Sequence, residues 1–242
     1  NKKQVNIAII GKYVELKDSY KSISESLIHA SAFLGFGINI NWIHSEKINN
    51  KNVKKLLSKC HGIIIAPGFG DRGIAGKITA VQFVRENKIP FFGICLGMQI
   101  AVIEFCRNIC GYKSAHSKEM DPFTKFPVID LMENQKEVID KGGTMRLGSY
   151  SCSISKGTKA FLAYKKSLIY ERHRHRYELN NIYKKDIIKN GMQCTGENKD
   201  LNLVEIIELK DHPWFIGVQF HPEYQSSFLQ PHPLFLSFLK AL

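Results

Sequence analysis

The stretch Ile89-Pro90-Phe91-Phe92-Gly93-Ile94-Cys95-Leu96-Gly97 decides the fold, because it places a thiol between a strand and a helix. The apolar residues before Gly93 predict a short buried strand, and residues 98–105 contain good helix formers without a breaker. Gly-x-Cys-x-Gly is the cysteine form of a nucleophile elbow, in which small residues permit a tight turn that exposes the side chain. The helix N-terminus favours a thiolate and offers N–H groups to an oxyanion. The alternative is a buried structural cysteine, a common fate of free thiols.

A second motif lies far downstream, where His221-Pro222-Glu223 follows an alternating apolar strand expected at 215–220. In an extended chain, His221 and Glu223 point to the same side, and Pro222 restricts the backbone between them. A carboxylate beside an imidazole fixes the tautomer of the ring and stabilises the imidazolium. The other ring nitrogen can then act as the base for a thiol. Alone, such a pair is typical of a protein surface. Together with Cys95 it forms a set of nucleophile, base and orienting carboxylate.

Strand and helix patterns alternate through the first half of the chain. Strands are expected at 5–10, 38–43, 63–66 and 89–92, and helices at 19–34, 53–58 and 74–87. This alternation predicts an α/β fold with a largely parallel open sheet flanked by helices. Ligands of such sheets bind outside the carboxyl ends of the strands, so the loop at Gly68 and Cys95 should face one crevice.

The second half is less regular and is expected to add antiparallel strands. Strands are predicted at 128–131, 144–151, 169–177, 192–196 and 203–209, and helices at 183–190 and 233–240. The charged, weakly patterned segment 133–141 predicts a mobile surface loop. Because no repeat or low-complexity linker occurs, residues 1–242 are interpreted as a single domain.

Length and composition limit the class of protein to which the chain can belong. A chain of 242 residues with 44% hydrophobic residues can bury a large α/β core. No apolar run approaches a membrane span, and the N-terminus has no signal-peptide core, although the missing initiator Met suggests a fragment. Six cysteines without framework spacing or a C-x-x-C pair predict a reducing, cytoplasmic location and no metal site.

The net charge of +12 raises the possibility of a basic nucleic-acid module. The lysines are dispersed, however, and neither aromatic–basic interleaving nor a reading helix is present. The sequence therefore favours no nucleic-acid partner and no membrane partner.

These motifs resemble the class I (triad) glutamine amidotransferases, and further stretches resemble the glutaminase domains of CTP synthases. The additional stretches run in the family's order along the chain: 11–13, 68–73, 142–148, 171–178 and 212–215. The resemblance implies a catalytic triad of Cys95, His221 and Glu223. It also implies an oxyanion hole from the backbone N–H groups of Gly68 and Leu96. The implied glutamine contacts are Gly68, Leu96, Gly97, Met98, Gln99, Glu119 and Arg176.

The chain departs from the family pattern at two of these places. Pro67 replaces a glycine of the usual Pro-Gly-Gly-Phe-Gly, which affects the loop that carries Gly68. His116 and Lys118 replace family residues beside Glu119, but the glutamate is kept. Without the resemblance, Glu119 and Arg176 would be interpreted as solvated surface charges.

The block Glu171 to Glu178 alternates arginine with histidine. On a strand, Arg172, Arg174 and Arg176 would share one face and the two histidines the other, with Glu171 and Glu178 available to neutralise the arginines. The resemblance implies that this block also lies close to an activating GTP, which would bind near Phe69, Leu147, Arg172 and Arg174.

The implied activity is hydrolysis of L-glutamine to glutamate and ammonia through a glutamyl thioester. The ammonia would aminate UTP in a synthetase domain of the same polypeptide, which is absent from this sequence and would bind ATP and Mg²⁺. The glutaminase domain itself would need no cofactor, and GTP would act as its activator. The full-length family is expected to form a homotetramer. Two alternatives stay open: the glutaminase domain of another triad amidotransferase, and a catalytically silent regulatory domain of the same fold.

Overall fold

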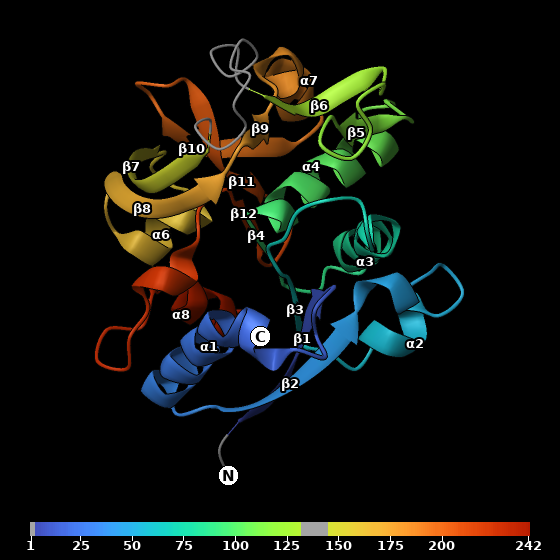
Figure 1. Cartoon of the computed structure of the whole chain (residues 1–242). Helices are drawn as coiled ribbons and strands as arrows, with labels where there is room; N and C mark the ends of the chain where they lie inside the picture. Colours follow the sequence, from blue (N-terminus) through green and yellow to red (C-terminus); the bar gives the residue numbers. More distant parts are fainter. Residues whose placement is uncertain (1–2, 132–144) are drawn as a thin grey trace.

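The computed structural model describes residues 3–131 and 145–242, in which two sheets are flanked by helices (Figure 1). The predicted loop at 133–141 and the residues Gly142 to Thr144 lie outside the described residues. The larger sheet has nine strands in the order β2-β1-β3-β4-β12-β11-β10-β7-β8, and the smaller has the order β5-β6-β9.

The five strands at one side of the large sheet are parallel. They are β2 (Gly37–His44), β1 (Gln4–Gly11), β3 (Gly62–Ile65), β4 (Phe91–Ile94) and β12 (Phe215–Val218). The last strand in sequence, β12, pairs in parallel with β4 in the register Gly217 to Gly93. The ends of β4 and β12 therefore place Cys95 and His221 at the same edge of the sheet.

Helices cover both faces of this parallel half, as the alternation in β1 requires. Ile7 and Ile9 pack in a cluster with α1 (Lys21–Leu34), α6 (Lys159–Tyr164) and α8 (Pro233–Lys240). Ala8 and Ile10 pack on the other side with α2 (Val53–Leu57), α3 (Ile74–Glu86) and α4 (Leu96–Asn108). All of these strand residues are fully buried.

The remaining four strands of the large sheet are antiparallel to their neighbours. They are β11 (Leu203–Leu209), β10 (Met192–Asn198), β7 (Arg146–Ile154) and β8 (Leu168–His175). The small sheet joins β5 (Ala115–Ser117), β6 (Phe126–Leu131) and β9 (Tyr177–Leu179). Helix α7 (Lys184–Lys189) follows it. The predicted fold class, a parallel sheet with antiparallel additions, is confirmed.

The strand predicted at 169–177 is two strands in different sheets. Within β8, Arg172 and Arg174 are exposed and His173 is buried, as the alternation predicts. Arg176 falls between β8 and β9, so it does not continue the row of arginines. The expectation that nearby glutamates neutralise this row is wrong, because Glu171 lies on the buried face of β8 and binds Tyr164 and His232.

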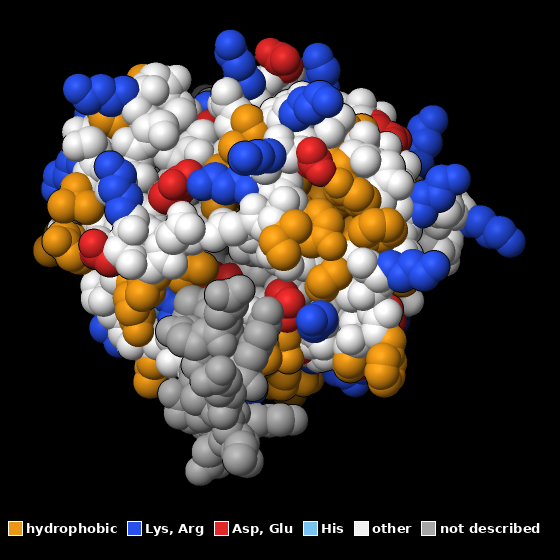
Figure 2. All heavy atoms as spheres, turned by 90° about the horizontal axis from the view of Figure 1, so that it is seen from above, with side chains coloured by type: hydrophobic (Ala, Val, Ile, Leu, Met, Phe, Trp, Pro, Cys, Tyr) orange, Lys and Arg blue, Asp and Glu red, His pale blue; other side chains and the backbone are white. Residues whose placement is uncertain are grey.

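Charge is spread over the surface. On the face shown in Figure 2, Lys and Arg side chains are interspersed with acidic, hydrophobic and uncharged ones. Within residues 3–131 and 145–242, no helix combines the length and apolar character that crossing a membrane requires.

Candidate active site

Cys95 occupies a strained turn between β4 and α4. Its φ of 51° and ψ of −104° lie in a region that side-chain-bearing residues rarely adopt. The turn is possible because both flanking positions are glycine: a Cβ on Gly97 would lie 2.4 Å from the carbonyl oxygen of Ile65, and one on Gly93 would lie 2.7 Å from the Gly97 backbone. The Cys95 N–H donates to Val218 of β12 at 2.7 Å, which fixes the elbow to the neighbouring strand.

His221 and Glu223 form a close pair at the end of β12. His221 Nδ1 lies 2.7 Å from Glu223 Oε1, and both residues are buried. The backbone differs from the extended chain predicted, because a 3-10 helix begins at Pro222 (η5, Pro222–Gln225), yet the side chains still meet. The His221 N–H donates to the Arg172 carbonyl at 2.8 Å, so β8 also holds this segment.

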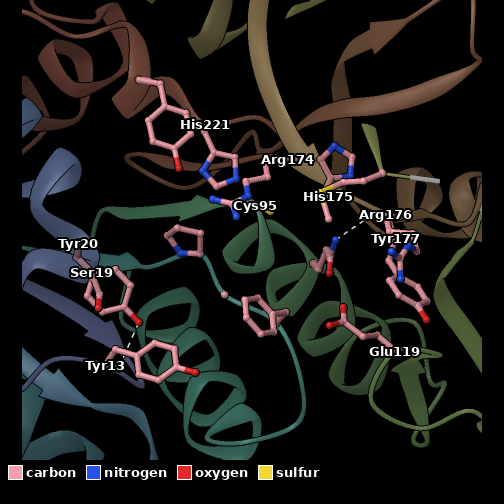
Figure 3. A pocket seen from close by; sticks show the side chains of 16 residues that line it. Tyr13, Ser19, Tyr20, Cys95, Glu119, Arg174, His175, Arg176, Tyr177 and His221 are labelled. Atoms are coloured by element: carbon pink, nitrogen blue, oxygen red, sulfur yellow. Dashed lines mark hydrogen bonds between the residues drawn. The ribbon is translucent and has the colours of Figure 1, made fainter. Parts of the chain in front are cut away.

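The imidazole of His221 lies beside the Cys95 sulfur (Figure 3). Burial opposes protonation of the ring, but the Cys95 thiolate and the Glu223 carboxylate outweigh it and raise the pKa of His221 to about 11. The Nε2 atom is buried and has no ordinary hydrogen-bond partner among the described residues. The arrangement therefore stabilises the imidazolium form of His221 beside the Cys95 sulfur.

Burial disfavours the thiolate form of the five cysteines outside the predicted triad. It raises the pKa of each of their thiols: Cys60, Cys106, Cys110, Cys152 and Cys194. These thiols stay protonated at neutral pH and are poor nucleophiles.

Two hydrogen-bonded glutamines also contact the Cys95 sulfur, one of them directly. Gln219 Nε2 donates to the Cys95 sulfur at 3.7 Å, and Gln99 Nε2 donates to Gln219 Oε1 at 3.2 Å and to the Tyr177 carbonyl at 2.9 Å. Gln99 is predicted from the sequence, whereas Gln219 is not. The position of Gln219, two residues before His221 and hence on the same side of the extended chain, was the available signal.

Cys95, His221 and Gln99 line a pocket of about 590 Å³ at the carboxyl ends of the parallel strands. The predicted site residues that line it are Gly68, Phe69, Cys95, Gln99, Glu119, Arg174, Arg176 and His221. Leu96, Gly97, Met98, Leu147, Arg172 and Glu223 do not line it. The side chains of Leu96 and Met98 are buried in the core, so only their backbone can face a ligand.

The loop that carries Gly68 crosses the pocket between β3 and α3. The Leu96 side chain packs against Gly68, and its Cδ2 lies 3.5 Å from the position of a Cβ there. Neither the Gly68 N–H nor the Leu96 N–H has a hydrogen-bond acceptor within the part of the chain that the structure describes. Lys12 Nζ donates to the Phe69 carbonyl and fixes the next residue of the loop.

Glu119 lies across the pocket from His221, near Arg176 and Tyr177 (Figure 3). Its Oε1 accepts a hydrogen bond from the Gly70 N–H at 2.8 Å. The carboxylate thus holds the far end of the same loop and remains at the pocket surface. An acid and an arginine facing one another in the pocket of the thiol suit the two charged groups of an α-amino acid.

A buried cluster of charges behind the pocket was not predicted from the sequence. Arg146 donates to Glu178 at 3.0 Å and to Glu205 at 2.7 Å, and His173 Nδ1 lies 2.9 Å from His175 Nε2. Burial raises the pKa of both glutamates, although the Arg146 guanidinium acts in the opposite direction. Burial, Arg146 and His221 lower the pKa of both histidines, which keeps them neutral.

Of the four residues expected near an activator, Phe69 and Arg174 line the pocket, whereas Leu147 and Arg172 do not. Phe69 is 68% exposed and Leu147 is 67% exposed, and Leu147 pairs with Arg174 across β7 and β8. Arg172 is exposed on β8 opposite Ser149. In the described ranges, no group of three or more His, Cys, Asp or Glu side chains is arranged to hold a metal ion.

Comparison with known proteins identifies the class. The family model described as "Glutamine amidotransferase class-I" matches residues 15–241. The fold alone is shared with more distant proteins, such as a glutamine amidotransferase from Thermotoga maritima (TM-score 0.53, 12% identity, covering 90% of this chain and 76% of that one).

Two curated relatives are similar over nearly the whole chain. The CTP synthase of Christiangramia forsetii is 59% identical over 240 residues, 99% of this chain and 44% of that protein. The CTP synthase of Clostridium acetobutylicum is 56% identical over 237 residues, 98% of this chain and 44% of that protein. The chain thus spans less than half the length of these relatives.

A solved structure of a single domain is also similar to this chain over nearly its whole length. The glutaminase domain of Trypanosoma brucei CTPS, with bound acivicin, has a TM-score of 0.92 and 36% identity, covering 98% of this chain and 93% of that one. The chain therefore belongs to the class I glutamine amidotransferases and, within them, to the glutaminase domains of CTP synthases.

Proposed function

We propose that this chain hydrolyses L-glutamine to glutamate and ammonia through Cys95, His221 and Glu223. The observation that supports this most directly is the imidazole held by Glu223 at 2.7 Å beside the thiol of a strained elbow. A thiolate and an imidazolium in one pocket provide both the nucleophile and the acid that amide cleavage needs.

In the first half of the reaction, the Cys95 sulfur attacks the side-chain amide carbon of glutamine and forms a C–S bond. The carbonyl oxygen takes the negative charge and is held by the N–H groups of Gly68 and Leu96. The C–N bond then breaks, and the leaving nitrogen takes a proton from His221, which releases ammonia and leaves a glutamyl thioester.

In the second half, water attacks the thioester carbon and gives a proton to His221. The C–S bond breaks, glutamate leaves, and the thiolate and imidazolium are restored. Glu223 orients the ring in both steps and stabilises its charged form. The substrate's α-amino and α-carboxylate groups would bind Glu119 and Arg176, with Gln99 and the backbone of Gly97 and Met98 supporting the site.

We further propose that the chain is one domain of a longer CTP synthase. The names of the relatives support this, together with the chain's coverage of 44% of their length. In that protein a synthetase domain would bind ATP and Mg²⁺ and use the ammonia to aminate UTP, within a homotetramer. GTP would activate the reaction at Phe69, Leu147, Arg172 and Arg174. A cytoplasmic location agrees with six unpaired cysteines.

The test is selective labelling of the thiol. A chloroketone analogue of glutamine should alkylate Cys95, detected by mass spectrometry, at least about tenfold faster than Cys60 or Cys194, whose thiols serve as internal controls. Excess L-glutamine should protect Cys95, and Cys95→Ala should lose both labelling and glutamine hydrolysis. Labelling of Cys95 no faster than that of the control thiols would favour a silent domain of this fold.

A second experiment distinguishes the kind of amidotransferase. In the full-length protein, GTP should stimulate glutamine hydrolysis and ATP with UTP should yield CTP. Stimulation by a different acceptor substrate, with no CTP formed, would assign the chain to another triad amidotransferase.

A further inference from the structure

Lys77 on α3 is a buried cationic side chain that the proposed reaction does not use. The side chain is 0% exposed, and its Nζ has no hydrogen-bond partner among the residues that the structure describes. Burying an ammonium group without a partner is costly, so such a group is driven towards its neutral form unless negative charge lies nearby. The position of this one relative to the pocket is therefore informative.

Lys77 Nζ lies directly under the loop between β3 and α3. It is 3.9 Å from the position that a Cβ on Gly68 would take, next to the Leu96 side chain at 3.5 Å from the same point. The ammonium group thus lies close to Gly68, one of the two residues whose N–H groups are proposed for the oxyanion hole. Both the helix that carries it and the turn that carries Cys95 are fixed by the core.

Among the described residues, no acidic side chain neutralises Lys77. The carboxylates on the elements packed against α3 are bound elsewhere: Glu46 of η2 (Ser45–Lys47) to Arg72 and His44, and Glu104 of α4 to Arg85. Glu119 holds the Gly70 N–H on the pocket side of the loop. The charged groups that act on Lys77 are the Lys12 ammonium and the Cys95 thiolate.

We propose that Lys77 is a positioning residue of the glutaminase site, whose buried charge favours the Cys95 thiolate and the oxyanion that forms above the Gly68 loop. This inference deepens the proposed function and depends on it. Negative charge on the sulfur, and later on the substrate oxygen, supplies the counter-charge that no acidic side chain among the described residues gives to Lys77. The interaction is reciprocal, because a group that favours the thiolate is itself favoured in its charged form.

The charge on Lys77 also depends on pH in the working range. Burial, and to a smaller extent the nearby Lys12, lower the pKa of Lys77 to about 7, while the Cys95 thiolate acts in the opposite direction. The residue is therefore cationic below neutral pH and largely neutral above about pH 8. Its contribution should be present in mildly acidic conditions and absent in alkaline ones.

The test compares wild type with Lys77→Met, which keeps the approximate length of the side chain and removes its charge. The rate of Cys95 alkylation by iodoacetamide, followed by mass spectrometry of the full chain, needs no turnover. Below about pH 6.5 the variant should react about threefold or more slowly, and at about pH 9 the two rates should agree within about 1.5-fold. Lys185→Met, on the exposed face of α7, is the control and should follow wild type throughout.

Two outcomes would overturn the inference: equal rates for Lys77→Met and wild type at every pH, or the same deficit at every pH, which would mark a packing role. Lys77→Gln, neutral but polar, must repeat the pH-dependent loss and carries the test if the Met variant does not fold. Failure of wild-type Cys95 to react with the chloroketone analogue would count against glutamine as substrate. It would leave the charge interaction measured by iodoacetamide intact.

Discussion

Lys77→Met should stabilise the fold, and by an amount that falls as the pH rises. The pKa of Lys77 drops from 10.5 to about 7 on folding, chiefly because the side chain is buried. At about 1.4 kcal/mol for each pKa unit, this corresponds to an upper bound of about 5 kcal/mol by which the ammonium group opposes folding.

The sign follows from proton counts. Between pH 7 and 10.5 the unfolded chain holds a proton on Lys77 that the folded protein has released, so the wild type gains stability as the pH rises through this window. Below about pH 7 both states are charged and the full cost applies. The variant has no such group, so its advantage should be about 5 kcal/mol at most at about pH 6.5 and about 2 kcal/mol at about pH 9.

Urea unfolding followed by far-UV circular dichroism at about pH 6.5, 8 and 9 measures this difference, with refolding in the same buffers as the check of reversibility. Lys185→Met should change the free energy of unfolding by less than about 0.5 kcal/mol at each pH. A Lys77→Met protein that is less stable than wild type at the lowest pH, or an advantage that does not shrink with pH, would refute the reasoning.

Three further outcomes are expected. Gly97→Ala should destabilise the protein by about 1–3 kcal/mol in urea unfolding, because the new methyl group would lie 2.4 Å from the Ile65 carbonyl oxygen; an unchanged midpoint would contradict the need for glycine. Glu223→Gln should lower the pKa of His221 from about 11, seen in an NMR titration of the ring, and reduce glutamine hydrolysis on the order of 100-fold or more; an unmoved titration would remove Glu223 from its role. Phe69→Ala should leave the unfolding free energy within about 0.5 kcal/mol, since the ring is 68% exposed, while weakening GTP stimulation of the full-length enzyme; retained stimulation would exclude the ring from the activator site.

The parts of the site that could be predicted from the sequence are those carried by local patterns. The elbow at Cys95 follows from glycines at fixed offsets between a strand and a helix, and His221 with Glu223 follows from a strand end. The parallel sheet follows from alternating elements. In each case the physical cause lies within a short stretch of chain.

The parts that could not be predicted depend on contacts between distant segments. Gln219 is a buried strand residue by pattern, and its bond to the Cys95 sulfur appears only once β12 lies beside β4. The sequence around Lys77 is that of an ordinary helix, so it does not reveal that this lysine is buried. Its burial is set by how α3 packs under the Gly68 loop. The break at Arg176, where β8 leaves one sheet and β9 enters another, likewise has no local breaker residue.

The place of β12 in the large sheet has a consequence for the protein while it is being made. This strand comes late in sequence yet lies in the centre of the sheet, between β4 and β11, and Val218 within it anchors the Cys95 backbone. A nascent polypeptide that ends before β12 has neither the base nor that anchor. Ribosome-bound or truncated chains should therefore consume no glutamine, and free ammonia should appear only after the central gap of the sheet has been filled.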